Sequence, residues 1–273
     1  MGWVRRKTFD LAARVLTKPR GNYNLIHPND LDNLRGVLRK GDVILVDGEQ
    51  RVSEVIKYLT QSSWSHSALY VGDEFIKRQP AQRDALIRTH GVDANHLLVE
   101  ALLEDGVTAA PVAKYQPFNL RICRPRNLRR EDLQRILDEV IAQIGLRYYV
   151  KNMIDLARYF FPMSLIPRRF RRRALALGSG LPTQVICSSI IARAFQNVGV
   201  PIHPAMTPST DPLPQARWLD RFRRRQAPYP GVFHREAPTL ITPRDFDLSP
   251  YFDIVKFNGV EVVNFDYRRI RWA

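Results

Sequence analysis

One cysteine and one histidine stand where their side chains can do covalent chemistry. Cys187 lies at the start of an amphipathic segment that runs to Gly199, and His66 precedes an apolar run at residues 68–71. A helix start and a neighbouring imidazolium both lower the pKa of a thiol, which is otherwise mostly protonated at neutral pH. The two residues therefore predict a nucleophilic cysteine with a histidine as its general base.

A carboxylate completes this predicted site. A histidine that acts as a base usually needs an orienting partner on its other ring nitrogen. Glu100 lies in the apolar run Leu97-Leu98-Val99-Glu100-Ala101, which predicts a strand. Buried carboxylates generally have a partner, and nearby antiparallel strands can place Glu100 and His66 on the same face. We expect Glu100 to orient His66, and the amide of Cys187 to help hold an oxyanion.

Each of these residues also has a purely structural explanation. A cysteine near a helix start is commonly a core residue, a histidine beside serines commonly belongs to a turn, and Glu100 has many arginines with which to pair. Cys123 lies in an alternating run and is interpreted as a core residue. The combination of the three residues in these settings favours catalysis over the structural explanations.

The sequence predicts neither a metal nor an organic cofactor. The other histidines show no metal-ligand spacing with a cysteine or with one another, so we expect no zinc site. The glycine motifs that cradle dinucleotides and nucleoside triphosphates do not occur either. The predicted thiol chemistry needs no such group.

The chain is strongly basic. It has 273 residues, with 42 Lys and Arg against 27 Asp and Glu, for a net charge of +15. This charge favours nucleic acid, acidic lipid head groups or acidic polymers as partners. No nucleic-acid-binding signature is present, so we do not expect that partner. The basic and aromatic segments 147–149 and 158–161, with the arginines of 168–173, are suited to an anionic membrane surface, but a solvated arginine face explains them equally well.

The sequence carries no run of about 20 apolar residues and no apolar stretch of a secretory signal. We therefore expect a cytoplasmic protein, with attachment to the inner face of a membrane as an alternative.

Hydrophobic patterning predicts an α+β fold. Short apolar runs separated by turn residues predict an antiparallel sheet between residues 41 and 124. Three- and four-residue spacing predicts helices after residue 129 and from 184 to 198. Further expectations are helices at 3–16, 51–59 and 150–160, an irregular proline-rich segment at 200–250, a capped turn at 242–245, and final strands at 251–255 and 260–265.

Four stretches follow one another in a set order. They are Leu38-Arg39-Lys40-Gly41-Asp42-Val43-Ile44-Leu45-Val46; Trp64-Ser65-His66-Ser67-Ala68-Leu69-Tyr70-Val71-Gly72; Val99-Glu100-Ala101 followed by Asp105-Gly106-Val107; and Cys187-Ser188-Ser189. This set resembles the circularly permuted NlpC/P60 superfamily, and within it the YiiX/YebB-like cysteine hydrolases. The resemblance covers about residues 38–200 and, weakly, Thr242-Pro243.

The resemblance implies a papain-like fold, in which the helix of the nucleophile packs on an antiparallel sheet that carries the histidine and a third polar residue. It implies Cys187 as nucleophile, His66 as general base and Glu100 as orienting residue, while permutation explains why the histidine comes first. Superfamily members cleave peptidoglycan peptides, and permuted relatives of the lecithin:retinol acyltransferase type transfer or hydrolyse acyl groups on lipids.

We therefore expect an N-terminal helical extension at residues 1–37. Residues 38–273 are expected to form one cysteine hydrolase domain, with a basic helical insertion at 147–177 and the proline-rich segment 200–250. The predicted activity is that of a thiol hydrolase or acyltransferase acting on an amide, ester or thioester through a Cys-His-Glu triad, with a lean toward a lipid or acylated substrate. A peptidoglycan-type amidase or peptidase, and a non-enzymatic basic module that binds a membrane surface or nucleic acid, are the alternatives.

Overall fold

The computed structural model describes residues 18–19, 21, 23–26, 29–78, 80–102, 105–146, 184–208, 231–235 and 237–257. The helices expected at 3–16 and 150–160, the basic insertion 147–177 and the strand expected at 260–265 lie outside the described residues.

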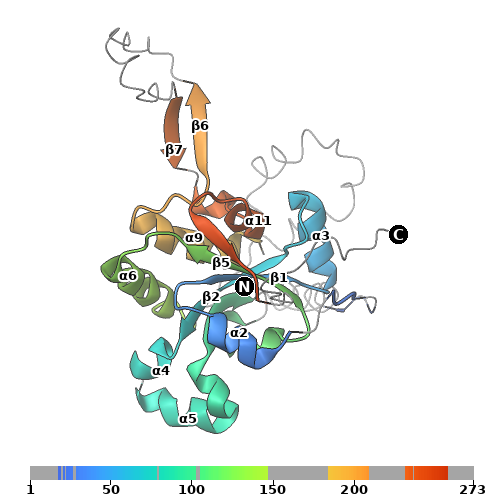
Figure 1. The fold of residues 1–273 in the computed structure, drawn as a ribbon, viewed down its shortest axis with the longest axis vertical. Coiled ribbons are helices and arrows are strands. Elements are labelled where there is room, and N and C mark those ends of the chain that lie inside the picture. Colours follow the sequence, from blue (N-terminus) through green and yellow to red (C-terminus); the bar gives the residue numbers. More distant parts are fainter. Residues whose placement is uncertain are drawn as a thin grey trace, which may run out of the picture.

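A six-stranded antiparallel sheet forms the centre of the fold (Figure 1). Its strands, in spatial order, are β4 (Gly106–Pro111), β3 (Leu97–Leu102), β2 (His66–Gly72), β1 (Val43–Asp47), β5 (Asn119–Pro125) and β8 (Phe252–Val255). The first four strands of the chain lie beside their sequence neighbours, and β5 returns to the other side of β1. The α+β class and the antiparallel sheet are therefore confirmed.

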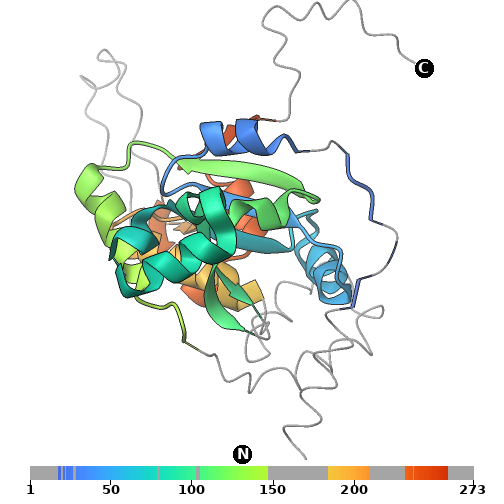
Figure 2. The same cartoon turned by 90° about the horizontal axis from the view of Figure 1, so that it is seen from below.

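Helices cover both faces of this sheet. The helices α6 (Arg130–Ile141) and α9 (Gln184–Asn197) pack together on one face, where α9 contacts β2 and β3. The helix α2 (Leu31–Val37) lies on the opposite face (Figure 2). The helix α3 (Arg51–Thr60) connects β1 to β2, close to its expected bounds.

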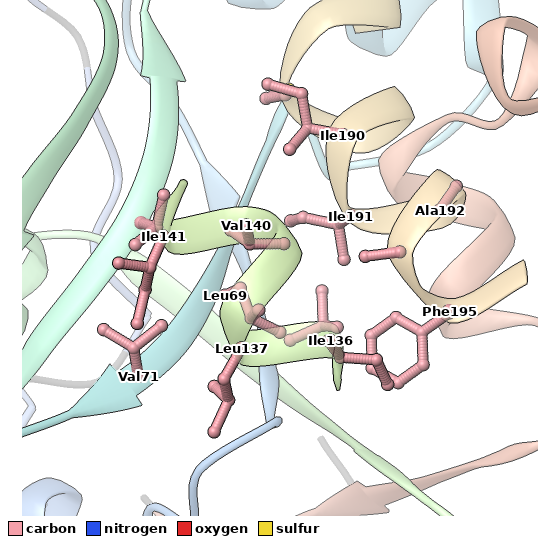
Figure 3. Close-up of a cluster of buried hydrophobic side chains, with 14 of the residues drawn as sticks. Leu69, Val71, Ile136, Leu137, Val140, Ile141, Ile190, Ile191, Ala192 and Phe195 are labelled. Atoms are coloured by element: carbon pink, nitrogen blue, oxygen red, sulfur yellow. The ribbon is translucent and has the colours of Figure 1, made fainter. Parts of the chain in front are cut away.

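Strand alternation divides the hydrophobic core into two clusters. Leu69 and Val71 of β2 point toward α6 and α9 and belong to the larger cluster (Figure 3). Ala68 and Tyr70 point the other way and pack with Leu34 of α2. The period of two along a strand thus gives β2 two buried faces. Cys123 is fully buried in the larger cluster, as predicted, and burial raises the pKa of its thiol.

Two short helices between β2 and β3 were not predicted. They are α4 (Glu74–Arg78) and α5 (Pro80–His90), followed by the 3-10 helix η1 (Gly91–Asn95). In α5, Leu86 packs against the core while its neighbour Ile87 is exposed. The helix therefore lacks the continuous apolar stripe on which a prediction from periodicity depends.

The expectation that residues 200–250 are irregular was wrong for part of this range. It contains a two-stranded ribbon of β6 (Pro204–Pro208) and β7 (Gly231–Arg235), which projects from the body of the molecule (Figure 1). Prolines stand at both ends of β6, and a two-stranded ribbon tolerates them because each strand has an unpaired edge.

The ribbon is followed by a second 3-10 helix and a capped helix. These are η5 (Pro238–Leu240) and α11 (Pro243–Asp247). A capping box between Thr242 and Asp245 begins α11, with Pro243 at its first position, so the predicted capped turn is present. Among the described helices, none has the length and apolar character needed to cross a membrane.

Candidate active site

The structure brings His66 and Glu100 together across two neighbouring strands. His66 is the first residue of β2, and Glu100 lies in β3, where Leu69 pairs with Val99. Both side chains extend from the face of the sheet on which Ala68 and Tyr70 pack against α2. The Nε2 atom of His66 lies 2.8 Å from Oε2 of Glu100.

Cys187 reaches the same histidine from the opposite face. It lies in the first turn of α9, which begins at Gln184, as the residue spacing predicted. Its sulfur and the imidazole of His66 are hydrogen-bonded. The histidine therefore links the two faces of the sheet at the beginning of β2.

The electrostatics of this pair favour a thiolate and an imidazolium. Burial by itself lowers the pKa of His66, but the charges of Cys187 and Glu100 outweigh burial and raise this pKa to about 10. Burial likewise raises the pKa of the Cys187 thiol, but the imidazolium of His66 outweighs it, so that the pKa is lowered. Both shifts favour the ion pair, with the proton on the imidazole, over the neutral thiol and neutral imidazole.

Ser67 adds a second influence on the sulfur. Burial is the largest influence on the thiol pKa and raises it, whereas the backbone N–H of Ser67, which donates to the sulfur, and the Ser67 hydroxyl both lower it. Ser67 is fully buried, and within the described part of the chain its Oγ makes no complete hydrogen bond. Its effect on the thiol pKa nevertheless connects this hydroxyl to Cys187.

Three side chains hold the carboxylate of Glu100, whose own side chain is completely buried. Besides His66, these are Lys114, whose Nζ donates to Oε1, and Tyr115, whose hydroxyl donates to Oε2. Burial raises the pKa of Glu100, but His66 and Lys114 outweigh it and lower this pKa to about 2. Burial and then Glu100 raise the pKa of Tyr115 well above its usual value, so the phenol keeps its proton and remains a donor.

Sequence reasoning missed Ser67, Lys114 and Tyr115. Ser67 had a usable signal, because it is a polar residue at an inward position of an otherwise apolar strand. The other two lie in the 3-10 helix η2 (Val112–Tyr115), which follows β4 directly. Nothing in the sequence near them indicates that this short helix turns back over Glu100.

The site is mostly enclosed. Cys187 is 3% exposed, and the side chain of His66 is 17% exposed. Over the residues that the structure describes, no group of three or more His, Cys, Asp and Glu side chains is arranged to hold a metal ion.

No family model matches the chain, and no curated protein matches it. A solved structure does: the metalloprotein YiiX from Escherichia coli O157:H7, of the group DUF1105. The match covers 80% of this chain and 97% of the YiiX chain, at 15% identity and a TM-score of 0.43. A likeness at this level transfers neither the metal nor an activity.

Proposed function

We propose that this protein is a thiol hydrolase or acyltransferase that acts on an amide, ester or thioester. Cys187 is the nucleophile, His66 the acid and base, and Glu100 the residue that positions His66. The observation that carries the proposal is the continuous contact from sulfur to imidazole to buried carboxylate. A thiolate held beside an imidazolium is the reactive form of a cysteine nucleophile.

We extend this proposal to a permuted papain-like fold of the NlpC/P60 type. What supports it is the arrangement of the elements: α9 carries the cysteine and packs against β2 and β3, which carry the histidine and the glutamate. The histidine strand precedes the cysteine helix in the chain, as the permutation requires.

The first half of the reaction forms an acyl-enzyme. The thiolate of Cys187 attacks the carbonyl carbon of the substrate, and the carbonyl electron pair moves onto oxygen. When the tetrahedral intermediate collapses, the bond to the leaving group breaks, and the imidazolium of His66 gives its proton to the departing nitrogen, oxygen or sulfur. The product is a thioester on Cys187, with His66 neutral and Glu100 still ionised.

The second half regenerates the enzyme. Neutral His66 takes a proton from water or from an acceptor hydroxyl or amine, which attacks the thioester carbonyl. The carbon–sulfur bond then breaks and sulfur leaves as the thiolate, so the ion pair with the imidazolium is restored. Water makes the protein a hydrolase, and another acceptor makes it an acyltransferase. No step requires a metal or an organic cofactor.

For the substrate we propose a lipid or another acylated molecule, with a peptidoglycan-type amide as the alternative. The preference rests on the net charge of +15, since each basic residue near an anionic bilayer contributes about 1 kcal/mol to binding. Sedimentation with anionic vesicles across a salt series tests it. Binding at low salt that weakens as salt rises supports the membrane-facing version. No binding at low salt removes the reason for preferring lipid.

Acyl transfer onto the protein tests the activity itself. The protein is incubated with a short-chain acyl thioester and with a peptide ester, and the labelled peptide is identified by mass spectrometry. We expect the acyl group on Cys187 and no labelling in Cys187→Ala. Cys123→Ala is the matched control, because it removes the other thiol and should still be labelled. Labelling that survives in Cys187→Ala, or no labelling of the wild type by either reagent, would contradict the proposal.

A further inference from the structure

Lys114 is the cation that neutralises the buried carboxylate. Its Nζ donates to Oε1 of Glu100, the oxygen that His66 and Tyr115 leave vacant. The Lys114 side chain is 37% exposed, and its ammonium group also lies over the ring of Tyr115, 5.1 Å from the ring centre. Adjacent residues of one short helix therefore fix both oxygens of Glu100.

These contacts produce a row of alternating charges. The thiolate of Cys187 meets the imidazolium of His66, which meets the carboxylate of Glu100, which meets the ammonium of Lys114. Two negative and two positive charges sum to zero. Without Lys114 the row would hold a net negative charge beside the buried carboxylate, and Oε1 would lose its donor.

We propose that Lys114 is a positioning residue that sets the pH above which Cys187 becomes a thiolate. The inference rests on the proposed function, because it assumes that the thiolate is the working form of the site. Lys114 does not touch the reacting sulfur and acts through Glu100 and His66.

The direction of the effect follows from charge alone. The titratable groups that share this row with Lys114 are His66 from β2, Glu100 from β3 and Cys187 from α9, and Tyr115 from η2 lies beside it. Removing a positive charge makes it harder to remove a proton from any of them, so each pKa rises. The pKa of Cys187 must therefore move upward, toward that of an ordinary thiol.

The size of the effect is limited by distance and by solvent. Three contacts separate the ammonium of Lys114 from the sulfur of Cys187. A unit charge at about 12 Å, with an effective dielectric constant of about 20, shifts a pKa by roughly one unit, and the partial exposure of Lys114 reduces this. We therefore expect the midpoint of thiolate formation to rise by about 0.5 to 1 pH unit when the charge is removed.

The test follows the ultraviolet absorbance of the thiolate during a pH titration, with the Cys187→Ala form of each variant subtracted. Lys114→Met should raise the midpoint of thiolate formation. Lys114→Arg, which keeps the positive charge, should leave the midpoint near the wild-type value. Lys77→Met is the matched control, because Lys77 is a more exposed lysine whose partner is Asp73. It should leave the midpoint at the wild-type value.

The titration distinguishes a failure of the role of Lys114 from a failure of the proposed function. If the wild type shows a lowered midpoint and Lys114→Met leaves it unchanged or lowers it, the role of Lys114 is wrong while the proposed function stands. If the wild-type thiol titrates like an ordinary cysteine, the proposed function itself fails. Lys114→Gln serves as a second neutral variant, so that a folding defect in Lys114→Met does not decide the result.

Discussion

His66 and Glu100 come from adjacent strands and share a short contact, with 2.8 Å between Nε2 and Oε2. This contact fixes the orientation of the imidazole ring, which is also hydrogen-bonded to Cys187. It also connects a helix on one face of the sheet with a carboxylate that extends from the other. The consequences of this one contact can be measured separately.

Replacing Glu100 by Gln should lower the pKa of His66. The imidazolium loses a charged hydrogen bond worth about 1.5–3 kcal/mol, which corresponds to a fall of roughly one to two pH units. The NMR shift of the His66 ring proton during a pH titration measures this midpoint. Glu139→Gln is the matched control, because that carboxylate binds Arg193 and Asn197 instead. Equal midpoints in both variants would show that Glu100 does not support the ion pair.

Acid should remove the stabilisation that Glu100 provides. Burial raises its pKa, but His66 and Lys114 outweigh burial. The pKa of Glu100 is therefore lowered from 4.5 to about 2 in the folded protein. A lowered folded-state pKa means that the contribution is fully present above about pH 4.5 and is lost as the pH falls toward about 2. In urea unfolding, the free-energy gap between wild type and Glu100→Gln should therefore narrow at low pH. A gap that stays constant would refute the low pKa.

His66 should remain protonated well into the alkaline range. Burial lowers its pKa, but the charges of Cys187 and Glu100 raise it from 6.5 to about 10. For a raised folded-state pKa, the stabilisation is complete below about pH 6.5 and is lost as the pH rises toward about 10. The NMR shift of the His66 ring proton measures the midpoint, which should fall in Cys187→Ala. An imidazole that titrates near its ordinary value in the wild type would contradict the ion pair.

Tyr115→Phe should destabilise the protein without removing a charge. The ring is kept, but Oε2 of the buried Glu100 loses a donor. A hydrogen bond to a charged group contributes about 1.5–3 kcal/mol, which should appear as a lower free energy of unfolding. Tyr58→Phe, at an exposed position of α3, is the control and should change little. Equal stability of the two variants would mean that the Tyr115 contact contributes nothing.

Ser67→Ala should weaken the thiolate with little loss of stability. The Ser67 hydroxyl is buried without a complete hydrogen bond among the described residues, so its removal leaves no protein donor or acceptor unpaired. It does lower the pKa of Cys187, and this pKa should rise in the variant. Ser65→Ala is the contrasting variant, because Oγ of Ser65 accepts from the backbone N–H of Gly48, 2.9 Å away. Ser65→Ala should lose stability and keep the thiolate; the reverse pattern would contradict our assignment.

Much of the fold was predictable because its strands carry a clear pattern. The apolar run at residues 43–46 and the alternation around Cys123 are strong local signals, and they gave the central strands. The helix α5 was missed because it has no continuous apolar stripe. The ribbon of β6 and β7 was missed because β6 begins and ends with proline, which is typical of irregular segments.

The site was partly predictable for a similar reason. Cys187, His66 and Glu100 each stand out locally, as a thiol in a first helical turn, a histidine at a strand start and a charge inside an apolar strand. Lys114 and Tyr115 act on Glu100 through a 3-10 helix whose path depends on tertiary packing. The contacts of Lys114 and Tyr115 with Glu100 therefore correspond to no periodic pattern in the sequence.

The pH dependence of Cys187 alkylation, in the wild type and in His66→Ala, tests the central claim most directly. In the wild type we expect iodoacetamide to react with an apparent pKa well below the value of about 8.5 for a free thiol. In His66→Ala the apparent pKa should rise to that value or above it, because burial then acts on the thiol without a cation beside it. An ordinary apparent pKa in the wild type, or the same lowered value in both proteins, would contradict a nucleophile activated by His66.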